Sequence, residues 1–350
     1  MNIMGSSRVV KYIRFAASLL YARLFNQRIP LFVTLCVTNR CNLRCVYCYA
    51  DCGSQERKEF TTREICDIVD HLCSLGMRYI SLNGGEALLR EDIDQVVDHI
   101  NQKGILCQIT TNGLLVEKKI EVLRKVDAIT MSLDGGRIEN DRNRGAGVYD
   151  HVMKAMKVLR ANKMRFQTSM VLTKNNVDSV KEALQLAQQL DFQVLFSPLR
   201  VEDSPDKELG LDDARLKETV RQIIGYKDAG FPVFFSRDVY QQFLDWPFSY
   251  NRLNVFKATD GFFEGDVCYL KQLSCHIESD GSVYPCIVLA KKVKVSSFLD
   301  VGIKQCFDQQ QKLSCQACWN FCCNDWNHVL SLRPRAWWNV LGIIKRRFTN

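Results

Sequence analysis

The segment LFVTLCVTNRCNLRCVYC, residues 31–48, is the most informative part of the sequence. Its first half, residues 31–37, is rich in apolar and β-branched side chains, which predicts a buried strand. Its second half places Cys41, Cys45 and Cys48 within eight residues of one another, directly after that strand. Three thiolates so close along the chain converge most easily on one inorganic centre.

Two kinds of centre fit these thiolates. Structural zinc usually takes four protein ligands, and Cys36 or Cys52 could complete such a set. A four-iron cluster that is held by only three cysteines instead leaves one iron without a protein ligand. That open iron is a place where chemistry can occur, so the two alternatives predict very different proteins.

The region from residue 30 to about residue 200 alternates short β-rich runs with amphipathic helical stretches. One helix is expected to begin at the capping-box residues Thr61 and Glu64 and to end at Gly76. Strand followed by helix, six times over, predicts an α/β fold in which a parallel sheet carries helices on its outside. Six units are too few for an eight-unit barrel, so we expect a partial, open (β/α)6 barrel of the TIM type. The predicted strands are residues 31–37, 79–82, 105–110, 128–133, 167–172 and 193–197.

Three further motifs each follow a predicted strand: Gly84-Gly85-Glu86, then TTNG at residues 110–113, then SLDG at residues 132–135. Parallel strands bring such segments to one edge of the sheet, where α/β barrels build their sites. Together with C-x3-C-x2-C and the aromatic Tyr47, the combination resembles the radical S-adenosylmethionine (radical SAM) superfamily over roughly residues 30–200. The resemblance implies a [4Fe–4S] cluster on Cys41, Cys45 and Cys48.

The resemblance also implies a reaction. The open iron would bind S-adenosylmethionine (SAM), and an electron from a flavodoxin or ferredoxin type of donor would lead to its cleavage to a 5′-deoxyadenosyl radical that abstracts hydrogen from a substrate. No catalytic residue is assigned beyond the cluster. By position, Gly84, Gly85 and Glu86 would hold the SAM amino group, and the backbone of Tyr47 would contact the adenine. Asn112, Ser132 and Asp134 would contact the ribose or the methionine part, and Arg144 would bind the SAM carboxylate. The complete set is Tyr47, Gly84, Gly85, Glu86, Asn112, Ser132, Asp134 and Arg144.

The chain has 16 cysteines, in two groups separated by a long gap without any. In a reducing compartment such groups favour metal or redox chemistry over disulfides. The second group resembles the SPASM and shorter twitch extensions of radical SAM enzymes, which implies at least one auxiliary Fe–S cluster on Cys268, Cys286, Cys315 and Cys318. Alternative ligands are Cys275, Cys322 and Cys323, whereas Cys306 has no expected role. A structural zinc knuckle is the other interpretation. Cys36, Cys66, Cys73 and Cys107 are expected to be core residues.

Positive charge is concentrated at the two ends of the chain. Residues 1–50 and 326–350 contain Arg and Lys but no acid, whereas the formal total is only +8, so the body of the protein is mildly acidic. A nucleic-acid partner is therefore not expected, because a protein that binds nucleic acid usually carries a stripe of positive charge across its fold. The expected regions are a basic amphipathic helix (1–29), the partial barrel (30–200), a helical or irregular connection (201–265), a SPASM/twitch-like Fe–S domain (266–325) and a basic aromatic helix (326–350).

The sequence leaves the substrate open between a peptide side chain, a sugar or alcohol, and a lipid-linked molecule. No 18-residue stretch lacks charge, so we expect a cytoplasmic protein without a membrane span. The basic ends, with Trp337 and Trp338, suggest peripheral contact with the inner face of the membrane; the alternative is that both helices simply pack on the barrel. A SAM-independent Fe–S electron-transfer protein and a zinc-stapled binding protein are the competing functions.

Overall fold

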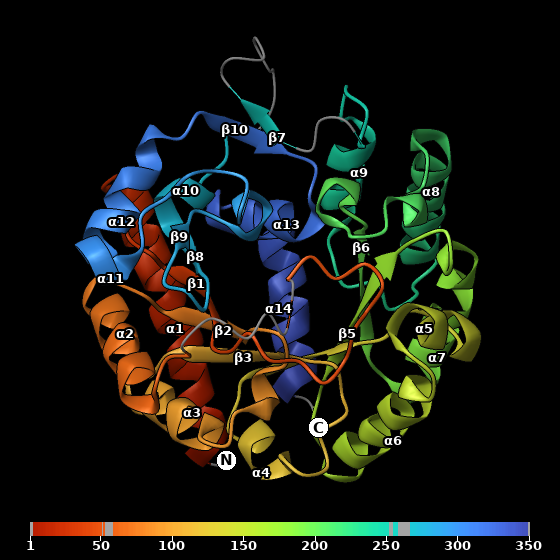
Figure 1. Cartoon of the computed structure of the whole chain (residues 1–350), viewed down its shortest axis with the longest axis horizontal. Coiled ribbons are helices and arrows are strands. Elements are labelled where there is room, and N and C mark those ends of the chain that lie inside the picture. Colours follow the sequence, from red (N-terminus) through yellow and green to blue (C-terminus); the bar gives the residue numbers. More distant parts are fainter. Residues whose placement is uncertain (1–2, 51, 53–58, 252–254, 258–266, 349–350) are drawn as a thin grey trace.

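The computed structural model describes residues 3–50, 52, 59–251, 255–257 and 267–348 (Figure 1). Its main element is an eight-stranded sheet with the order β6-β5-β4-β3-β2-β1-β8-β9, in which every neighbouring pair from β6 to β8 is parallel. A second sheet pairs β7 with β10. The strands are β1 (Phe32–Cys36), β2 (Tyr79–Asn83), β3 (Leu106–Thr111), β4 (Ala128–Ser132), β5 (Gln167–Leu172), β6 (Gln193–Pro198), β7 (Val255–Lys257), β8 (Ser274–Ile277), β9 (Val283–Tyr284) and β10 (Cys315–Cys318).

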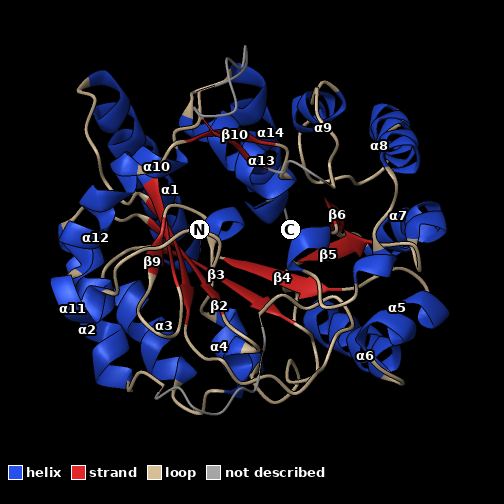
Figure 2. Ribbon diagram, turned by 45° about the horizontal axis from the view of Figure 1, so that its top comes forward, coloured by secondary structure: helices blue, strands red, loops and turns tan. Residues whose placement is uncertain are grey.

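Helices cover the outer face of the curved sheet (Figure 2). The α/β class, the six parallel strands and the partial barrel are therefore as the sequence predicts. The helices are α1 (Ile3–Leu24), α2 (Thr62–Ser74), α3 (Ile93–Gln102), α4 (Ile120–Arg124), α5 (Arg137–Arg144), α6 (Val148–Ala161), α7 (Val180–Leu190), α8 (Asp213–Asp228), α9 (Arg237–Leu244), α10 (Leu270–Leu273), α11 (Phe298–Val301), α12 (Ile303–Gln309), α13 (Phe321–Leu330) and α14 (Pro334–Phe348).

Helix α2 shows how local sequence fixes an element. The Thr61 side chain accepts a hydrogen bond from the Glu64 N–H, and the Glu64 carboxylate accepts one from the Thr61 N–H, which is a complete capping box. The helix is followed by Gly76, whose φ of +106° is one that side-chain-bearing residues rarely adopt. Both predicted ends of this helix are confirmed.

The C-terminal half contains two elements that the sequence did not predict individually. Strand β8 pairs in parallel with β1 and, together with β9, extends the barrel sheet by two strands. Helix α9, which buries Val239, Tyr240 and Phe243, lies in the connection that was expected to be helical or irregular over residues 201–265. Both elements are short, and short elements are set by tertiary contacts more than by their own sequence pattern.

Helix α13 lies at the open side of the curved sheet and fills part of its interior (Figure 1). The ring of Trp326 stacks on that of Phe32 at a centroid distance of 4.0 Å, and Tyr79 and Phe15 pack edge-on against it. Aromatic pairs of this kind contribute about 0.5–1.5 kcal/mol each beyond the burial of their area. The Cys-rich region is therefore packed directly against the first strands of the barrel.

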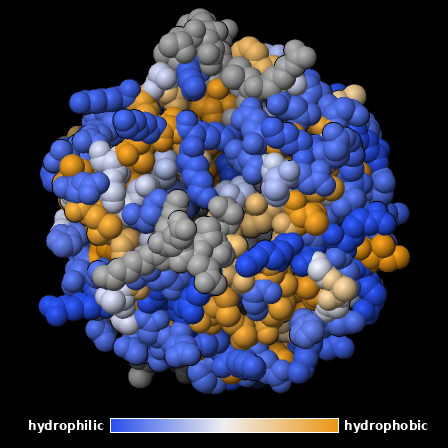
Figure 3. Space-filling model, viewed as in Figure 1, coloured by the Kyte–Doolittle hydropathy of each residue, from blue (hydrophilic) through white to orange (hydrophobic). Residues whose placement is uncertain are grey.

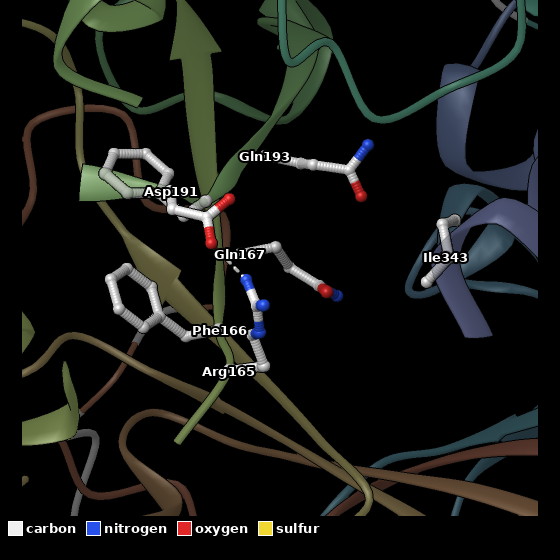
Figure 4. Close-up of a pocket in the computed structure, with 7 residues that line it drawn as sticks. Arg165, Phe166, Gln167, Asp191, Gln193 and Ile343 are labelled. Atoms are coloured by element: carbon white, nitrogen blue, oxygen red, sulfur yellow. Dashed lines mark hydrogen bonds and ion pairs between the residues drawn. The ribbon is translucent and has the colours of Figure 1, made fainter. Parts of the chain in front are cut away.

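Helices α1 and α14 pack near the N-terminal ends of the strands. Phe15 and Trp337 belong to one apolar cluster there, and Ile343 of α14 lies farther along, in a pocket beside β5 and β6. In Figure 4 the side chains of Gln167 and Gln193 extend toward Ile343 from the first residues of these two strands. None of the described helices has the length and hydropathy required to cross a membrane.

Candidate functional site

The loop that follows β1 carries the three cysteines of the C-x3-C-x2-C motif. A backbone hydrogen bond from Cys48 N–H to Cys45 O, 3.0 Å long, turns the loop back on itself. The thiols of Cys41, Cys45 and Cys48 are near enough to influence one another electrostatically, and the thiol of Cys52 donates to those of Cys41 and Cys48. The structure therefore brings the three predicted ligands together, with a fourth thiol beside them.

The thiols of this loop differ in acidity. The hydrogen bond from Cys52 lowers the pKa of Cys41 to about 6 and that of Cys48 to about 6. Burial instead raises the pKa of Cys45 to about 11, although the nearby Arg144 opposes this effect. Thiolates are the form that binds iron or zinc, so two of the three motif cysteines are already poised as ligands near neutral pH.

The Gly84-Gly85-Glu86 segment approaches the cysteine loop closely after β2. The Gly85 N–H donates to Thr38 O at 3.0 Å, and the Glu86 N–H donates to Arg40 O at 2.8 Å. A Cβ atom at Gly85 would lie 2.3 Å from Arg40 O, a distance that real Cβ atoms do not reach. Glycine is required here because it lets one backbone pass directly over the other.

Glu86 connects this segment to the TTNG motif after β3. Its buried carboxylate accepts hydrogen bonds from the Thr111 hydroxyl at 2.8 Å and from the Asn112 N–H at 2.7 Å. Burial raises the pKa of Glu86 to about 7, although both hydrogen bonds favour the ionised form. The Asn112 amide donates to Asn42 Oδ1 at 2.7 Å, which joins TTNG to the cysteine loop.

The SLDG motif after β4 supplies a buried ion pair. Asp134 Oδ2 lies 2.9 Å from Arg144 Nε and also accepts a hydrogen bond from the Tyr47 hydroxyl. The Arg144 Nη1 atom lies 4.0 Å from Cys45 Sγ. Ser132 is the last residue of β4 and is half-buried at the same strand end. All eight predicted SAM-contact residues thus lie at the C-terminal ends of β1 to β4 or in the segments that follow them.

A second group of thiols forms from the C-terminal cysteines. Cys268 is close to Cys286, Cys315 and Cys318. The Cys323 thiol donates to those of Cys286 and Cys318, and its hydrogen bond lowers the pKa of Cys286 to about 7. The predicted set of four is therefore brought together, and Cys323 joins it as a fifth thiol.

The remaining C-terminal cysteines lie elsewhere. Cys275 is buried on β8 near Cys306, and Cys322 is exposed. Within the described part of the chain, neither Cys275 nor Cys322 interacts with the thiols around Cys286. Of the three alternatives named from the sequence, Cys323 is therefore the one that joins this group. The sequence offers no signal for this choice, because Cys322 and Cys323 are adjacent on α13. Which of the two faces the other thiols depends on how this helix is oriented in the fold.

Sequence reasoning missed two residues near the first site. His276 of β8 and Glu278 directly after it lie against Cys36, which was expected to be an ordinary core residue. Because β8 was not predicted, nothing in the sequence placed these side chains beside β1. The face seen in Figure 3 is mostly hydrophilic, and its hydrophobic residues form several separate patches, one of them below the centre of the view.

Comparisons with known proteins agree with this geometry. The sequence model of the Radical SAM superfamily matches residues 35–187. The chain is 32% identical over 178 residues to mycofactocin maturase MftC of Mycolicibacterium smegmatis, a match that covers 49% of this chain and 45% of that protein. It is 30% identical over 158 residues to Fe-coproporphyrin III synthase of Methanosarcina barkeri, covering 44% of this chain and 40% of that protein. The chain thus matches less than half the length of these curated relatives.

Solved structures with the same fold extend over more of the chain. Streptococcus suis SuiB bound to S-adenosylmethionine superimposes with a TM-score of 0.61 at 19% identity, covering 83% of this chain and 68% of SuiB. Native anSMEcpe with bound AdoMet gives a TM-score of 0.59 at 20% identity, covering 81% of this chain and 83% of that one. At such identities the likeness shows the fold. The part of the chain from residue 35 to residue 187 thus matches the radical SAM superfamily in sequence.

Proposed function

We propose that this protein is a radical SAM enzyme with an auxiliary Fe–S cluster. The observation that carries the proposal is the convergence of Cys41, Cys45 and Cys48 with the three following motifs at one edge of the sheet. When bound there, a [4Fe–4S] cluster with one open iron supplies the reductive cleavage of SAM to methionine and a 5′-deoxyadenosyl radical. Low-potential Fe–S clusters suited to this task are well within the known range.

The chain's own residues prepare the place for the nucleotide. Gly84 and Gly85 keep the β2 loop against the cysteine loop, so that their carbonyl groups are available to the SAM amino group. Glu86 and Asn112 tie the next motif to the same position. Arg144, beside Cys45, supplies a positive charge for the SAM carboxylate. Tyr47, Ser132 and Asp134 complete the proposed contacts.

The auxiliary cluster is proposed on Cys268, Cys286, Cys315 and Cys318, with Cys323 as the replacement for one of them. Five thiols around one place exceed the four that one cubane needs. One cluster therefore fits this group better than two. A flavodoxin or ferredoxin type of protein is proposed as the electron donor.

The substrate class that we propose is a peptide side chain. Two observations support it: the relative from M. smegmatis is named a maturase, and SuiB has been solved with its precursor peptide SuiA. A sugar, an alcohol or a lipid-linked molecule remains the alternative from the sequence. Incubation with candidate peptides and mass spectrometry of the products separates these classes.

We further propose that α1 and α14 hold the protein at an anionic membrane surface. One face of α1 packs on the barrel through Phe15 and Leu19, and Lys11 forms a buried ion pair with Asp127 at 2.8 Å. Other apolar side chains of α1 are nevertheless exposed, and so are Trp338 and Leu341 of α14. The exposed residues are Val9, Val10, Ile13, Leu20, Tyr21 and Leu24 of α1, and Phe25 directly after it. Such aromatic and apolar groups beside cations suit the lipid interface.

Vesicle binding tests the membrane contact. The protein should co-sediment with anionic vesicles at low salt, and a variant in which Leu24 and Trp338 are both changed to Ser should stay in the supernatant. A double change of the exposed Lys304 and Lys294 to Ser is the control, because it alters surface charge elsewhere. Failure of the parent protein to co-sediment would end this part of the proposal.

Anaerobic reconstitution with iron, sulfide and a reductant tests the enzyme itself. The proposed function predicts a brown protein that releases 5′-deoxyadenosine from SAM after reduction. Iron and sulfide without any 5′-deoxyadenosine would indicate a SAM-independent electron carrier. A colourless protein that contains only zinc would indicate a zinc-stapled binding protein.

A further inference from the structure

Cys36, His276 and Glu278 form a compact group of metal-binding side chains outside both sets of clustered cysteines. Their ligand atoms all lie within 4.8 Å of one another. Zinc–ligand bonds of about 2.0–2.3 Å at tetrahedral angles place neighbouring ligand atoms about 3.3–3.6 Å apart. Small side-chain rotations are therefore enough for all three to reach one ion.

The backbone fixes the relative position of the three side chains. Strands β1 and β8 pair in parallel register, with Thr34 opposite His276 and Leu35 opposite Ile277. Because side chains alternate along a strand, Leu35 and Ile277 point into the core on one face, and His276, Glu278 and Cys36 share the other. Cys36 and His276 thus lie on paired strands at the carboxyl edge of the sheet, and Glu278 directly follows β8.

The chemistry of the group also fits a metal. His276 is 1% exposed, its Nε2 lies 2.9 Å from Glu278 Oε1, and its Nδ1 has no hydrogen-bond partner within the described part of the chain. An unsatisfied buried polar atom costs about 1–3 kcal/mol, so the imidazole is not fully used by the protein. One thiolate and one carboxylate would neutralise a dication.

We propose that Cys36, His276 and Glu278 bind a single Zn²⁺ ion through one sulfur, one ring nitrogen and one carboxylate oxygen. Zinc is favoured over magnesium or calcium because the set contains a thiolate and an imidazole. Three protein ligands leave a fourth position for water or for a group of the substrate, as in catalytic zinc sites. The Tyr49 hydroxyl is close enough to Cys36, Glu278 and Cys48 to be influenced by the charge of all three. The proposal does not depend on the proposed function, since none of its ligands belongs to the cluster motifs.

Metal analysis of the anaerobically purified full chain tests the site. We expect about one zinc per chain that survives desalting, and a decrease of about tenfold or more in His276→Gln and in Cys36→Ala, with iron and sulfide unchanged. Cys275→Ala is the matched control, because it removes a buried thiol from the residue next to His276 on the opposite face of β8. This variant should keep its zinc. Circular dichroism establishes that each variant is folded.

X-ray absorption at the zinc edge distinguishes the site from zinc that has entered an Fe–S position. One sulfur with nitrogen and oxygen scatterers supports the proposal, and loss of this signal in His276→Gln supports it further. Four sulfur scatterers, absence of zinc from the parent protein, or full zinc retention in folded His276→Gln would each overturn it. Because iron, sulfide and 5′-deoxyadenosine are measured separately, failure here leaves the proposed enzyme untouched.

Discussion

Arg144 Nε lies 2.9 Å from Asp134 Oδ2, and the two side chains are only 7% and 0% exposed. Burial alone would lower the pKa of Arg144, but the charge and hydrogen bond of Asp134, together with Tyr47 and Cys45, outweigh burial and raise that pKa. Arg144→Gln should therefore destabilise the protein by about 3–5 kcal/mol, because the Asp134 charge would be left buried without its partner. Urea unfolding of the anaerobic protein measures the loss.

The exposed pair of Arg137 and Asp150 is the control for this prediction. Their side chains are 56% and 60% exposed, so Arg137→Gln should cost less than about 1 kcal/mol. The double variant Asp134→Asn with Arg144→Gln should regain part of the loss, since it removes both charges. Equal losses for Arg144→Gln and Arg137→Gln would contradict the buried ion pair.

Gly85→Ala should reduce iron incorporation. The new Cβ would meet Arg40 O and the Cys41 Cβ, at 2.3 and 2.9 Å, so the cysteine loop must move for the side chain to fit. We expect iron per chain after reconstitution to decrease at least severalfold. Gly225→Ala on the exposed side of α8 is the control. Apart from its chain neighbours and the backbone of its own helix, no atom lies within 4 Å of the new Cβ, and the change should stabilise the helix by roughly 0.5–1 kcal/mol with normal iron content.

The sequence predicts the barrel well because its strands and helices repeat with a clear period and its helix ends carry explicit signals, as at Thr61 and Gly76. It also predicts that the motif residues lie close together, since a parallel sheet brings the ends of its strands to one edge. This explains why Cys41, Gly85 and Asn112 meet in the structure although they lie far apart in the chain.

What the sequence does not predict depends on contacts between distant segments. Strand β8 is only Ser274–Ile277, too short for its alternation to be distinguished, and its partner β1 lies more than two hundred residues earlier. Without that pairing, His276 could not be placed beside Cys36. The choice between Cys322 and Cys323 similarly depends on how α13 is rotated against the sheet.

The two cysteine groups should separate by their effects on SAM. Cys45→Ala removes a ligand of the proposed SAM cluster and should abolish release of 5′-deoxyadenosine. Cys318→Ala should keep some release while losing the product of the substrate reaction, because only the auxiliary group is changed. Chromatography of reaction mixtures measures both. Cys66, which is half-buried on α2, is the control, and Cys66→Ala should behave like the parent protein. If Cys45→Ala and Cys318→Ala also behaved like the parent, the proposed division of roles would be wrong.

Asp325→Asn should stabilise the protein at neutral pH. Burial raises the pKa of Asp325 from 3.8 to about 7, although a hydrogen bond from the Ser236 N–H and the charge of Lys227 favour ionisation. The pKa of Asp325 is higher in the folded protein than in the unfolded one, so ionisation of this acid destabilises the fold. The free energy of unfolding therefore decreases as the pH rises from about 4 to about 7. A shift of this size corresponds to at most about 4 kcal/mol, and the residual solvent contact of the side chain reduces our expectation to about 1–2 kcal/mol.

Thermal unfolding between pH 4 and pH 8 measures this effect. The melting temperature of Asp325→Asn should match that of the parent near pH 4, rise above it progressively to about pH 7 and then keep a constant lead, because Asn can still accept from Ser236. Asp150→Asn is the control of opposite sign: a hydrogen bond from Arg137 lowers the pKa of Asp150, so its ionised form stabilises the folded state. That variant should be no more stable than the parent at neutral pH. A higher melting temperature of the parent than of Asp325→Asn at pH 7 would instead mean that the surroundings stabilise the carboxylate more than burial destabilises it.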